Sequence, residues 1–239
     1  MILFHEKQVN WLKHFTESYI IENYIMEALI KFYVEIETSG GSNMFYEKFQ
    51  YRFDCGTIFK RFWKLKLFKD KFQELVGTEK MEKFINWLLN DTNYCLEEGI
   101  SKLSEIKKYE TKIGSGTIPN EEEKKEHEKN ENICRANLQL SNQCIWMVKE
   151  ISDWAKESFN NEVFTSRMAS SFNLVLNRIV GPQCIELKVN NPSKYKFSPI
   201  ELLADLITIY NNLSSIEMFV SNVAGDANFK IQNAQKAGR

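Results

Sequence analysis

Residues that break helices are scarce in this sequence, which has only 4 prolines and 10 glycines among 239 residues. An all-β chain of this length would need turn residues far more often, and βαβ units would show β-branched runs between their helices. The sequence has neither pattern. It therefore predicts an all-α fold in which long helices end where the few helix breakers gather.

The stretch from residue 167 to residue 213 has the clearest signals for helix ends and helix starts. Gly181-Pro182 predicts a helix end, because glycine suits a C-terminal cap and proline cannot continue the helix. Ser198-Pro199-Ile200-Glu201 predicts the next start, as a capping box with proline at the first helical position. Upstream of Gly181, residues that share one helix face recur at three- and four-residue spacing: Met168, Ser171, Phe172, Val175 and Ile179. We expect two helices joined by an irregular connector, Gln183–Phe197.

Two longer helices are expected over residues 78–112 and 121–159, joined by the polar loop 113–120. The charged start of the second helix, residues 121–131, is interpreted as solvated, with acidic residues that suit the helix dipole. Its later part carries an apolar seam that steps by four and three residues: Leu140, Cys144, Met147, Ile151 and Trp154. These two helices should form an antiparallel hairpin.

Shorter elements complete the expected organisation. The N-terminal part predicts a helix over residues 6–37, a new start at Ser42 or Asn43, two short helices within 44–67 that meet near Asp54-Cys55-Gly56, and another short helix over 70–76. Asn160-Asn161 should cap the helix that ends at Gly181, and Ser214-Ser215 should precede a last helix.

Helical pairs of this kind predict an elongated α-solenoid of armadillo or HEAT type, although no repeat of fixed period is present in the letters. Residues 1–223 would form one helical-repeat scaffold. The tail, residues 224–239, is polar and has few apolar anchors, so we expect it to be loosely attached.

Composition limits the classes of partner. The net charge is −1, with 31 basic and 32 acidic residues mixed along the chain, whereas binding to a phosphate backbone needs a basic surplus. No window approaches the ~18 apolar residues of a membrane helix, and the N-terminus lacks the pattern of a secretory signal. We therefore expect neither nucleic-acid nor membrane binding. The odd, scattered cysteines fit reduced thiols in a cytosolic or nuclear protein: Cys55, Cys95, Cys134, Cys144 and Cys184.

Motifs of enzyme chemistry are missing from the letters, which contain no phosphate loop, G-x-S-x-G, H-E-x-x-H or EF-hand pattern. We expect no catalytic residue, cofactor or metal. The three histidines, His5, His14 and His127, are interpreted as solvated or structural. For Cys184 packing is the default and a catalytic thiol the alternative, because no histidine in its sequence context would activate it. For Asp91 a bend or a ridge of polar contacts to a neighbouring helix is preferred over a catalytic carboxylate.

Three stretches resemble a known family. They are Val34–Trp63, Phe84–Ile106 and the run LNRIVGPQCIELKVNNPSKYKFSPIELL, and they occur in the order found in the core region of the ubiquitin chain-elongation factors, the "E-four" class of U-box ubiquitin ligases. In the last run the positions that match the family pattern are Val180, Gly181, Pro182, Leu187, Lys188, Val189, Asn191, Pro192, Lys194, Tyr195 and Phe197.

This resemblance implies an armadillo-like core in which these motif residues are structural. In the family, the core positions a C-terminal U-box that recruits a ubiquitin-conjugating enzyme and extends ubiquitin chains on substrates that are already modified. The implied partners are the AAA ATPase segregase, proteasomal shuttle factors and ubiquitylated substrates. The implied processes are protein quality control and ER-associated degradation, in the cytoplasm and nucleus.

The sequence departs from the family pattern after Val223, where Gly225–Phe229 replaces a Gly-Arg-Ser-aromatic run and no U-box follows within the 239 residues. Our leading hypothesis is the scaffold portion of a chain-elongation ligase, which alone would bind partners without stimulating ubiquitin transfer. The alternative is a stand-alone α-solenoid adaptor without ligase activity. A third class is a small enzyme that depends on Cys184.

Overall fold

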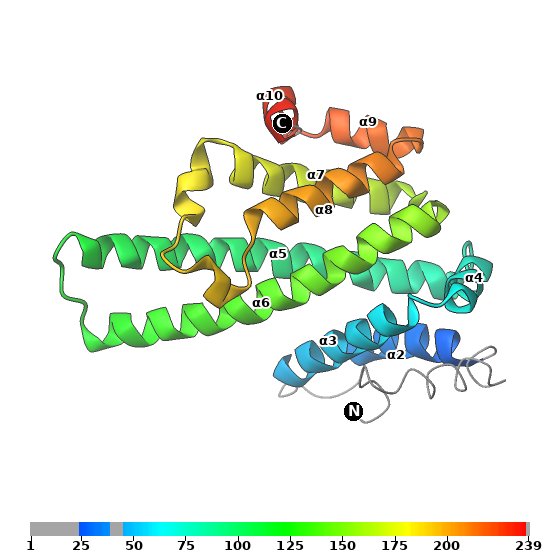
Figure 1. Ribbon diagram of the computed structural model, residues 1–239, viewed down its shortest axis with the longest axis horizontal. Helices are drawn as coiled ribbons and strands as arrows, with labels where there is room; N and C mark the ends of the chain where they lie inside the picture. The colour runs from blue at the N-terminus through cyan, green and yellow to red at the C-terminus, as the bar shows by residue number, and fades with distance from the viewer. Residues whose placement is uncertain (1–23, 39–44, 238–239) are drawn as a thin grey trace. The chain divides into compact units, whose positions relative to one another are not determined.

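The computed structural model describes residues 24–38 and 45–237 (Figure 1). Within these ranges the regular structure is helical and contains no strand, which confirms the all-α class. None of the described helices combines the length and apolarity needed to cross a lipid bilayer. The chain divides into two compact units, one up to Trp87 and one from Leu88 onward.

The first unit is built around aromatic side chains. It contains α2 (Met26–Thr38), α3 (Phe45–Phe62), α4 (Lys66–Glu74) and the first turns of α5 (Glu79–Gly114). The ring of Phe59 lies at the centre, with ring centroids at 4.9 to 6.2 Å from those of Trp63, Phe68, Phe72 and Phe84. Each such pair adds about 0.5–1.5 kcal/mol to the stability gained from buried area. These rings therefore fix α3 and α4 against the start of α5.

The prediction of two short helices within residues 44–67 is wrong, because α3 runs unbroken through Gly56. A glycine inside a helix costs only about 1 kcal/mol relative to alanine, and burial of the neighbouring side chains outweighs it. Cys55 is buried and its thiol donates to the carbonyl oxygen of Leu29 on α2, 3.8 Å away. The helix expected over 70–76 begins earlier, at Lys66. Of the helix predicted over residues 6–37, the end corresponds to α2, and residues 6–23 lie outside the described residues, as do His5, His14 and the predicted start at Ser42 or Asn43.

The second unit begins with an antiparallel hairpin of α5 and α6 (Glu121–Trp154), as predicted. Contact pairs show the direction, because residue numbers rise on one helix as they fall on the other: Gly99 with Cys134, Tyr109 with His127 and Lys112 with Glu123. The helices approach closely at Gly99, where an added Cβ would lie 2.6 Å from Leu138 Cδ2. A side chain at residue 99 would therefore displace the buried side chain of Leu138.

A complete capping box starts α6, at a place where the sequence predicted only a charged run. The side chain of Asn120 accepts from the backbone N–H of Glu123 at 2.9 Å, and the Glu123 carboxylate accepts from the Asn120 N–H at 3.1 Å. At the predicted box before α8 (Pro199–Leu213), only the serine half forms. Ser198 Oγ accepts from the Glu201 N–H at 3.5 Å, and among the described contacts no return bond from Glu201 is formed.

The apolar seam of α6 is confirmed at four of its five residues, since Leu140, Cys144, Met147 and Ile151 are buried. Trp154 is 38% exposed, because α6 ends there rather than at residue 159. A short 3-10 turn, η5 (Lys156–Phe159), then leads to α7 (Glu162–Val180). Asn161 caps α7 as predicted, with its side chain accepting from the Val163 N–H at 2.9 Å.

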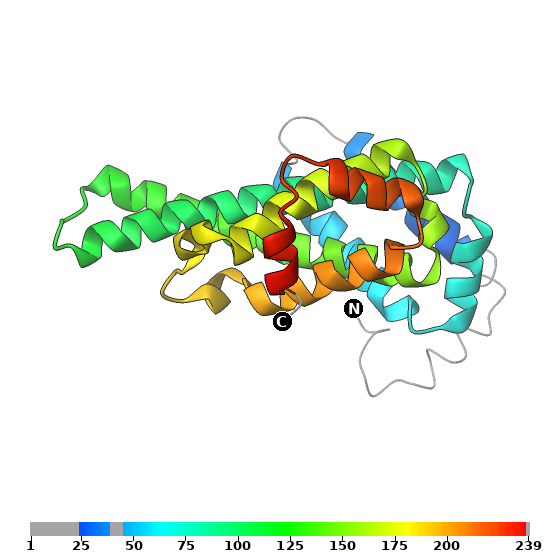
Figure 2. The same ribbon diagram turned by 90° about the horizontal axis from the view of Figure 1, so that it is seen from above.

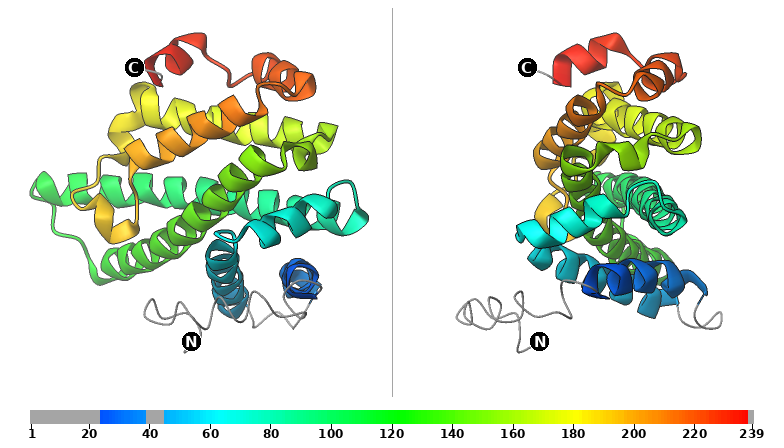
Figure 3. Two further views of the ribbon diagram at one scale, coloured as in Figure 1. Left: turned by 45° about the vertical axis from the view of Figure 1, so that its right-hand side comes forward. Right: turned by 90° about the vertical axis from the view of Figure 1, so that its right-hand side faces the viewer.

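Helices α7 and α8 pack against each other, α8 also packs on α6, and α9 (Glu217–Gly225) packs on α7. Figure 3 shows the α7–α8 pair lying between the α5–α6 pair and the two short helices α9 and α10. Of the predicted α7 face, Met168, Ser171, Phe172 and Val175 are buried and Ile179 is half-buried. Stacked helical pairs of this kind are consistent with the predicted solenoid class.

The tail makes more contacts than its composition suggests. It contains α10 (Ile231–Ala237), which lies across the α7–α8 pair (Figure 2). Asn233 Nδ2 donates to Asn177 Oδ1 at 2.7 Å, and Lys236 Nζ donates to the carbonyl oxygen of Val180 at 3.1 Å. These anchors are polar and depend on α7, so a search for apolar anchors in the tail alone cannot find them.

Candidate functional site

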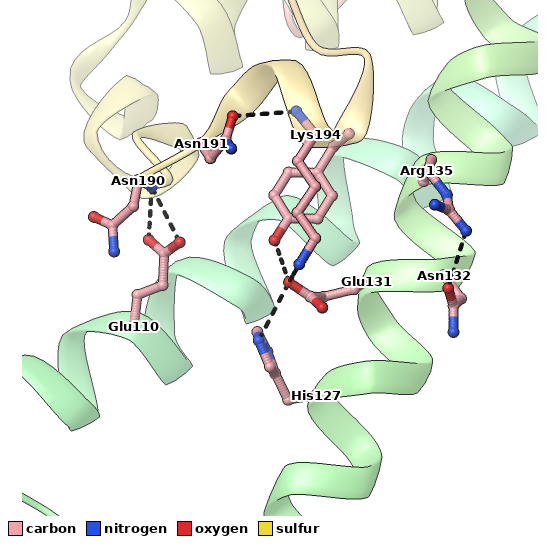
Figure 4. A network of polar contacts seen from close by, with 9 residues as sticks. Glu110, His127, Glu131, Asn132, Arg135, Asn190, Asn191 and Lys194 are labelled. Carbon is pink, nitrogen blue, oxygen red and sulfur yellow. Dashed lines mark hydrogen bonds and ion pairs between the residues drawn. The ribbon is translucent and has the colours of Figure 1, made fainter.

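The connector between α7 and α8 docks on the α5–α6 hairpin (Figure 4). It contains two 3-10 turns, η6 (Pro182–Leu187) and η7 (Pro192–Tyr195), each of which begins with a proline. The second turn is capped by Asn191, whose side chain accepts from the Lys194 N–H at 3.3 Å. The predicted irregular segment is therefore an ordered pair of tight turns.

Gly181 occupies the predicted C-cap of α7, but the reason for a glycine differs from the predicted one. Its backbone is extended, with φ −75° and ψ −179°, a conformation open to any residue. An added Cβ would instead lie 2.3 Å from the backbone oxygen of Asn177, which is fixed within α7. The glycine is required by this close approach of the chain to the helix it has just left.

Most apolar residues of the connector are buried, with Ile185 as the exception at 64% exposure, and its lysines are exposed. Leu187, Val189, Tyr195 and Phe197 are each at most 7% exposed. Lys188, Asn191 and Pro192 are exposed. The buried members of the family-like pattern therefore act as anchors that hold the connector to the rest of the second unit.

Glu131 on α6 is the centre of the polar contacts. Its Oε1 accepts from Tyr195 Oη at 2.5 Å and from Lys194 Nζ at 2.5 Å, and His127 Nε2 lies 3.4 Å away. Burial favours a raised pKa for Glu131, but the hydrogen bonds from Lys194 and Tyr195 outweigh burial and hold the pKa below its ordinary value. Burial, followed by the neighbouring carboxylate, raises the pKa of Tyr195. This carboxylate is therefore held ionised between a cation and a neutral hydroxyl.

Two further contacts fix the backbone of the connector. Glu110 on α5 accepts from the Asn190 N–H with both carboxylate oxygens, at 3.0 and 2.9 Å. Asn142 Nδ2 on α6 donates to the carbonyl oxygen of Lys196 at 2.8 Å. Lys196 has φ 57°, in the left-handed region that side chains other than those of Gly, Asn and Asp seldom adopt. Three residues from two helices thus hold the connector, and they are called the connector clamp: Glu110, Glu131 and Asn142.

The chain matches the family model described as the ubiquitin elongating factor core over residues 2–239. It belongs to this family. The predicted resemblance is therefore confirmed.

Named relatives agree with this assignment. The chain is 31% identical over 217 residues to the "Ubiquitin conjugation factor E4" of Schizosaccharomyces pombe, covering 87% of the chain and 22% of the relative. It is 31% identical over 224 residues to the "E4 ubiquitin-protein ligase UFD2" of Saccharomyces cerevisiae, covering 89% and 23%. It is 29% identical over 240 residues to the "Ubiquitin conjugation factor E4 A" of Bos taurus, covering 94% and 22%. The chain spans about a fifth of the length of these relatives.

Burial limits the reactivity of two cysteines in this family core. Burial raises the pKa of the Cys55 and Cys134 thiols to about 12, and the thiolate is the reactive form of cysteine. These two thiols are therefore held in their unreactive state. Cys184 is half-buried in η6. Among the described residues, no three His, Cys, Asp or Glu side chains are grouped so that they could hold a metal ion.

The polar stretch of α5 at residues 90–93 contacts a neighbouring helix, as preferred from the sequence. Arg167 Nη1 on α7 donates to Asn90 Oδ1 at 2.6 Å, and α5 continues through this stretch as a helix. Asp91 is 9% exposed within the same stretch. His127 has a structural role, because its ring stacks on Tyr109 at 3.9 Å between centroids and its Nε2 faces Glu131.

Sequence reasoning missed the connector clamp. Glu131 is the last residue of the charged run 121–131, and the interpretation of that run as solvated is wrong at its end, since Asn130 is buried and Glu131 is half-buried. The four-residue spacing of His127 and Glu131 is a signal for a local pair. The decisive partner, Tyr195, lies 64 residues away in the chain, and no local pattern points to it.

Proposed function

We propose that this chain is the scaffold part of a ubiquitin chain-elongation factor and acts in protein ubiquitination by binding other proteins. The match to the ubiquitin elongating factor core over nearly the whole chain carries this proposal. The relatives are named as ubiquitin conjugation factors and as a ubiquitin-protein ligase. Because the chain spans about a fifth of them, the ligase activity belongs to the proposed longer protein, with a U-box that recruits a ubiquitin-conjugating enzyme.

The geometry of the second unit supports a scaffold role. The connector is fixed to two helices by buried apolar anchors and by the connector clamp, so that successive helix pairs keep one orientation. A scaffold needs this property, since its surface must present binding sites at constant spacing. The raised pKa of Cys55 and Cys134 also disfavours a covalent thioester with ubiquitin at either residue.

The proposal extends to partners and location. In the longer protein the core would contact proteins of the ubiquitin pathway, including an AAA ATPase segregase, proteasomal shuttle factors and ubiquitylated substrates. The processes would be protein quality control and ER-associated degradation in the cytoplasm and nucleus. The family assignment supports the ubiquitin pathway as a whole, and each of these partners is a separate subject for experiment.

A chimera tests the proposal. The aligned 217 residues of the Schizosaccharomyces pombe relative would be replaced by this chain, and extension of ubiquitin chains would be measured on a substrate that already carries one ubiquitin. We expect the chimera to retain extension at a rate within about tenfold of that relative, because the core supplies positioning rather than the chemical step. Residues 1–239 alone should not accelerate extension in the same assay.

A matched chimera carrying Gly181→Ala would disturb the connector, and we expect it to lose activity relative to the parent chimera. A second control carrying Gly114→Ala, where an added Cβ meets nothing within 4 Å, should match the parent. A correctly folded parent chimera without extension activity would contradict the scaffold proposal and favour the stand-alone adaptor. Acceleration by residues 1–239 alone would contradict the assignment of a binding role.

A further inference from the structure

The segment that joins the end of α3 to α4, residues 60–71, collects basic side chains in the first unit (Figure 1). It has one acidic residue, Asp70, whereas basic and acidic residues nearly balance over the whole chain. Its six basic residues are here called the basic corner: Lys60, Arg61, Lys64, Lys66, Lys69 and Lys71. Positive charge is therefore concentrated in this segment although the net charge of the chain is −1.

Aromatic residues of α3 and α4 hold the backbone of the basic corner in place. Phe62, Trp63, Phe68 and Phe72 are each at most 2% exposed. The ring of Phe62 stacks on that of Phe68 with 5.4 Å between centroids, and the rings of Trp63 and Phe72 are 5.2 Å apart. The turn between the helices is tight, since the Leu65 N–H donates to the carbonyl oxygen of Phe62 at 2.9 Å. The basic side chains are therefore carried by a backbone that the buried rings fix.

Only part of this charge is neutralised by neighbouring acids. Lys66 pairs with Asp70 at 2.7 Å, and Lys71 pairs with a glutamate three residues later at 3.0 Å. Both acids are solvent-accessible, and ion pairs of this kind hold their charges only weakly. Through their side chains, Arg61 and Lys64 form no ion pair or hydrogen bond with any residue that the structure describes. Positive charge at the surface therefore remains open to an external anion.

The stability of the helices explains only half of the basic corner. Lys60 and Arg61 lie in the last turn of α3, where the helix dipole favours cations. The first turn of α4 has no acidic residue, and Leu65 at its N-cap makes no side-chain hydrogen bond. Lys66 and Lys69 lie in this first turn, at the positive end of the dipole, where a cation works against the helix. Residues placed against local stability are typical of functional surfaces.

The surroundings of the basic corner favour carboxylates on a protein over other anions. All aromatic residues within 59–72 are buried, so none can stack on the bases of a nucleic acid. Lysine makes up five of the six basic residues, whereas arginine is the side chain that binds phosphate in a bidentate way. Outside residues 60–71 acidic residues outnumber basic ones, so a long polyanion or an anionic membrane would meet net negative charge beyond the corner.

We propose that the basic corner is a docking site for a short acidic segment of a partner protein, rich in aspartate and glutamate. Six extended residues span about 20 Å, enough to cross the nine-residue helix α4, about 14 Å long, and the turn before it. The proposal rests on charge and exposure in the first unit and does not depend on the function in ubiquitination. The chimera assay and the binding assay below can therefore fail independently.

A fluorescent hexapeptide of alternating aspartate and glutamate serves as the probe. Its binding to the full chain is followed by anisotropy, beside a hexapeptide of alternating serine and glycine, which should not bind. We expect the affinity of the acidic peptide to fall at least about tenfold between about 50 mM and about 300 mM salt, because salt screens exposed charges.

Two double variants test the site of binding. Lys60→Ser with Lys64→Ser removes two exposed lysines of the basic corner and should weaken binding about tenfold. Lys108→Ser with Lys125→Ser removes two exposed lysines of α5 and α6 and leaves the same net charge, so its affinity should stay within about twofold of the parent. Circular dichroism checks that both variants are folded. Lys64→Ser alone should weaken binding about threefold, which keeps the test available if the first double variant does not fold.

Equal losses in the two double variants would overturn the proposal, since binding would then follow net charge rather than the basic corner. Absent or salt-insensitive binding of the acidic peptide would also overturn it. Tighter binding of a thymidine hexanucleotide than of the acidic peptide would assign the basic corner to nucleic acid. Binding to phosphatidylserine vesicles that Lys60→Ser with Lys64→Ser abolishes would assign it to a membrane surface, and either result contradicts a protein partner.

Discussion

Two segments of the second unit, the connector and the tail, lie across helices in different ways. The connector buries four apolar side chains and is held by the connector clamp, whereas α10 of the tail buries no side chain and is attached through asparagines and a lysine. Burial of an apolar side chain contributes about 1.5–3 kcal/mol to stability, whereas an intramolecular hydrogen bond makes a net contribution of about 1 kcal/mol. The connector is therefore an integral part of the fold, whereas the tail is the more weakly held of the two segments.

Truncating one aromatic residue in each segment gives the largest contrast. Phe197→Ala removes a buried anchor of the connector and should lower the free energy of unfolding by about 3–4 kcal/mol. Phe229→Ala in the half-buried tail should cost about 1 kcal/mol or less. Urea unfolding of both variants measures the difference, and similar losses would show that the two segments are equally integral.

Gly181→Ala should be the next largest effect. The new Cβ would approach the Asn177 backbone oxygen at 2.3 Å, so the end of α7 has to shift at a cost of about 1–3 kcal/mol. Gly114→Ala at the end of α5 meets nothing within 4 Å and should be neutral or stabilising by up to about 1 kcal/mol. Thermal melting of the two variants compares them, and a neutral Gly181→Ala would remove the steric reason given for this glycine.

Tyr195→Phe keeps the buried ring and removes the hydroxyl that donates to Glu131. We expect a loss of about 1–2 kcal/mol, because hydrogen bonds to charged groups are among the stronger ones. Tyr210→Phe offers a comparison. The Tyr210 hydroxyl donates to the neutral amide of Asn173, so the loss of this hydrogen bond should cost less. The order of the two losses in chemical denaturation is the test, and the reverse order would contradict the importance of the connector clamp.

The connector clamp also predicts a dependence on pH. The pKa of Glu131 is lowered in the folded protein. The stability that its carboxylate contributes is therefore fully present above the pKa of the unfolded chain, ~4.3, and is lost as pH falls through the folded pKa. Glu131→Gln should therefore flatten the decline of stability in this acidic window. Glu128→Gln, an exposed acid on the same helix, is the matched control and should leave the decline intact. An unchanged decline in Glu131→Gln would rule out this contribution.

The smallest effect concerns the backbone. Lys196 adopts φ 57°, which costs a residue with a Cβ about 1–2 kcal/mol. Lys196→Gly relieves this cost, while the greater freedom of glycine in the unfolded chain takes back about 0.4–1 kcal/mol. A net gain of about 0.5 kcal/mol is expected, measurable as a small rise in melting temperature. A clear loss would indicate that the lysine side chain itself stabilises the connector.

Local chemistry made much of the fold predictable. The caps at Asn161 and Ser198, the end of α7 at Gly181 and the hairpin of α5 and α6 all follow from short stretches of sequence. The unbroken α3 was not predictable in this way, because the packing of Cys55 on α2 decides it against the local preference of Gly56. The sequence also identified the connector through its family-like residues, several of which prove to be its buried anchors.

The partners of the connector and of the tail could not be predicted. Glu110, Glu131 and Asn142 are 80, 64 and 54 residues from the groups they bind, and on their own helices they look like ordinary surface residues. The anchors of the tail on Asn177 and Val180 depend in the same way on the position of α7. Such pairs are fixed by tertiary packing, which a single sequence does not encode in any local pattern.

Native-state hydrogen exchange tests the contrast between connector and tail most directly. Backbone N–H groups are bonded in both segments, Asn190 to Glu110 and Phe197 to Pro192 in the connector, and Ala234 to Lys230 in the tail. Exchange of the connector amides should require opening of the second unit, whereas the tail amides should exchange at least about a hundredfold faster through local detachment. Equal protection of the two segments would contradict the account, because the tail would then be as integral to the fold as the connector.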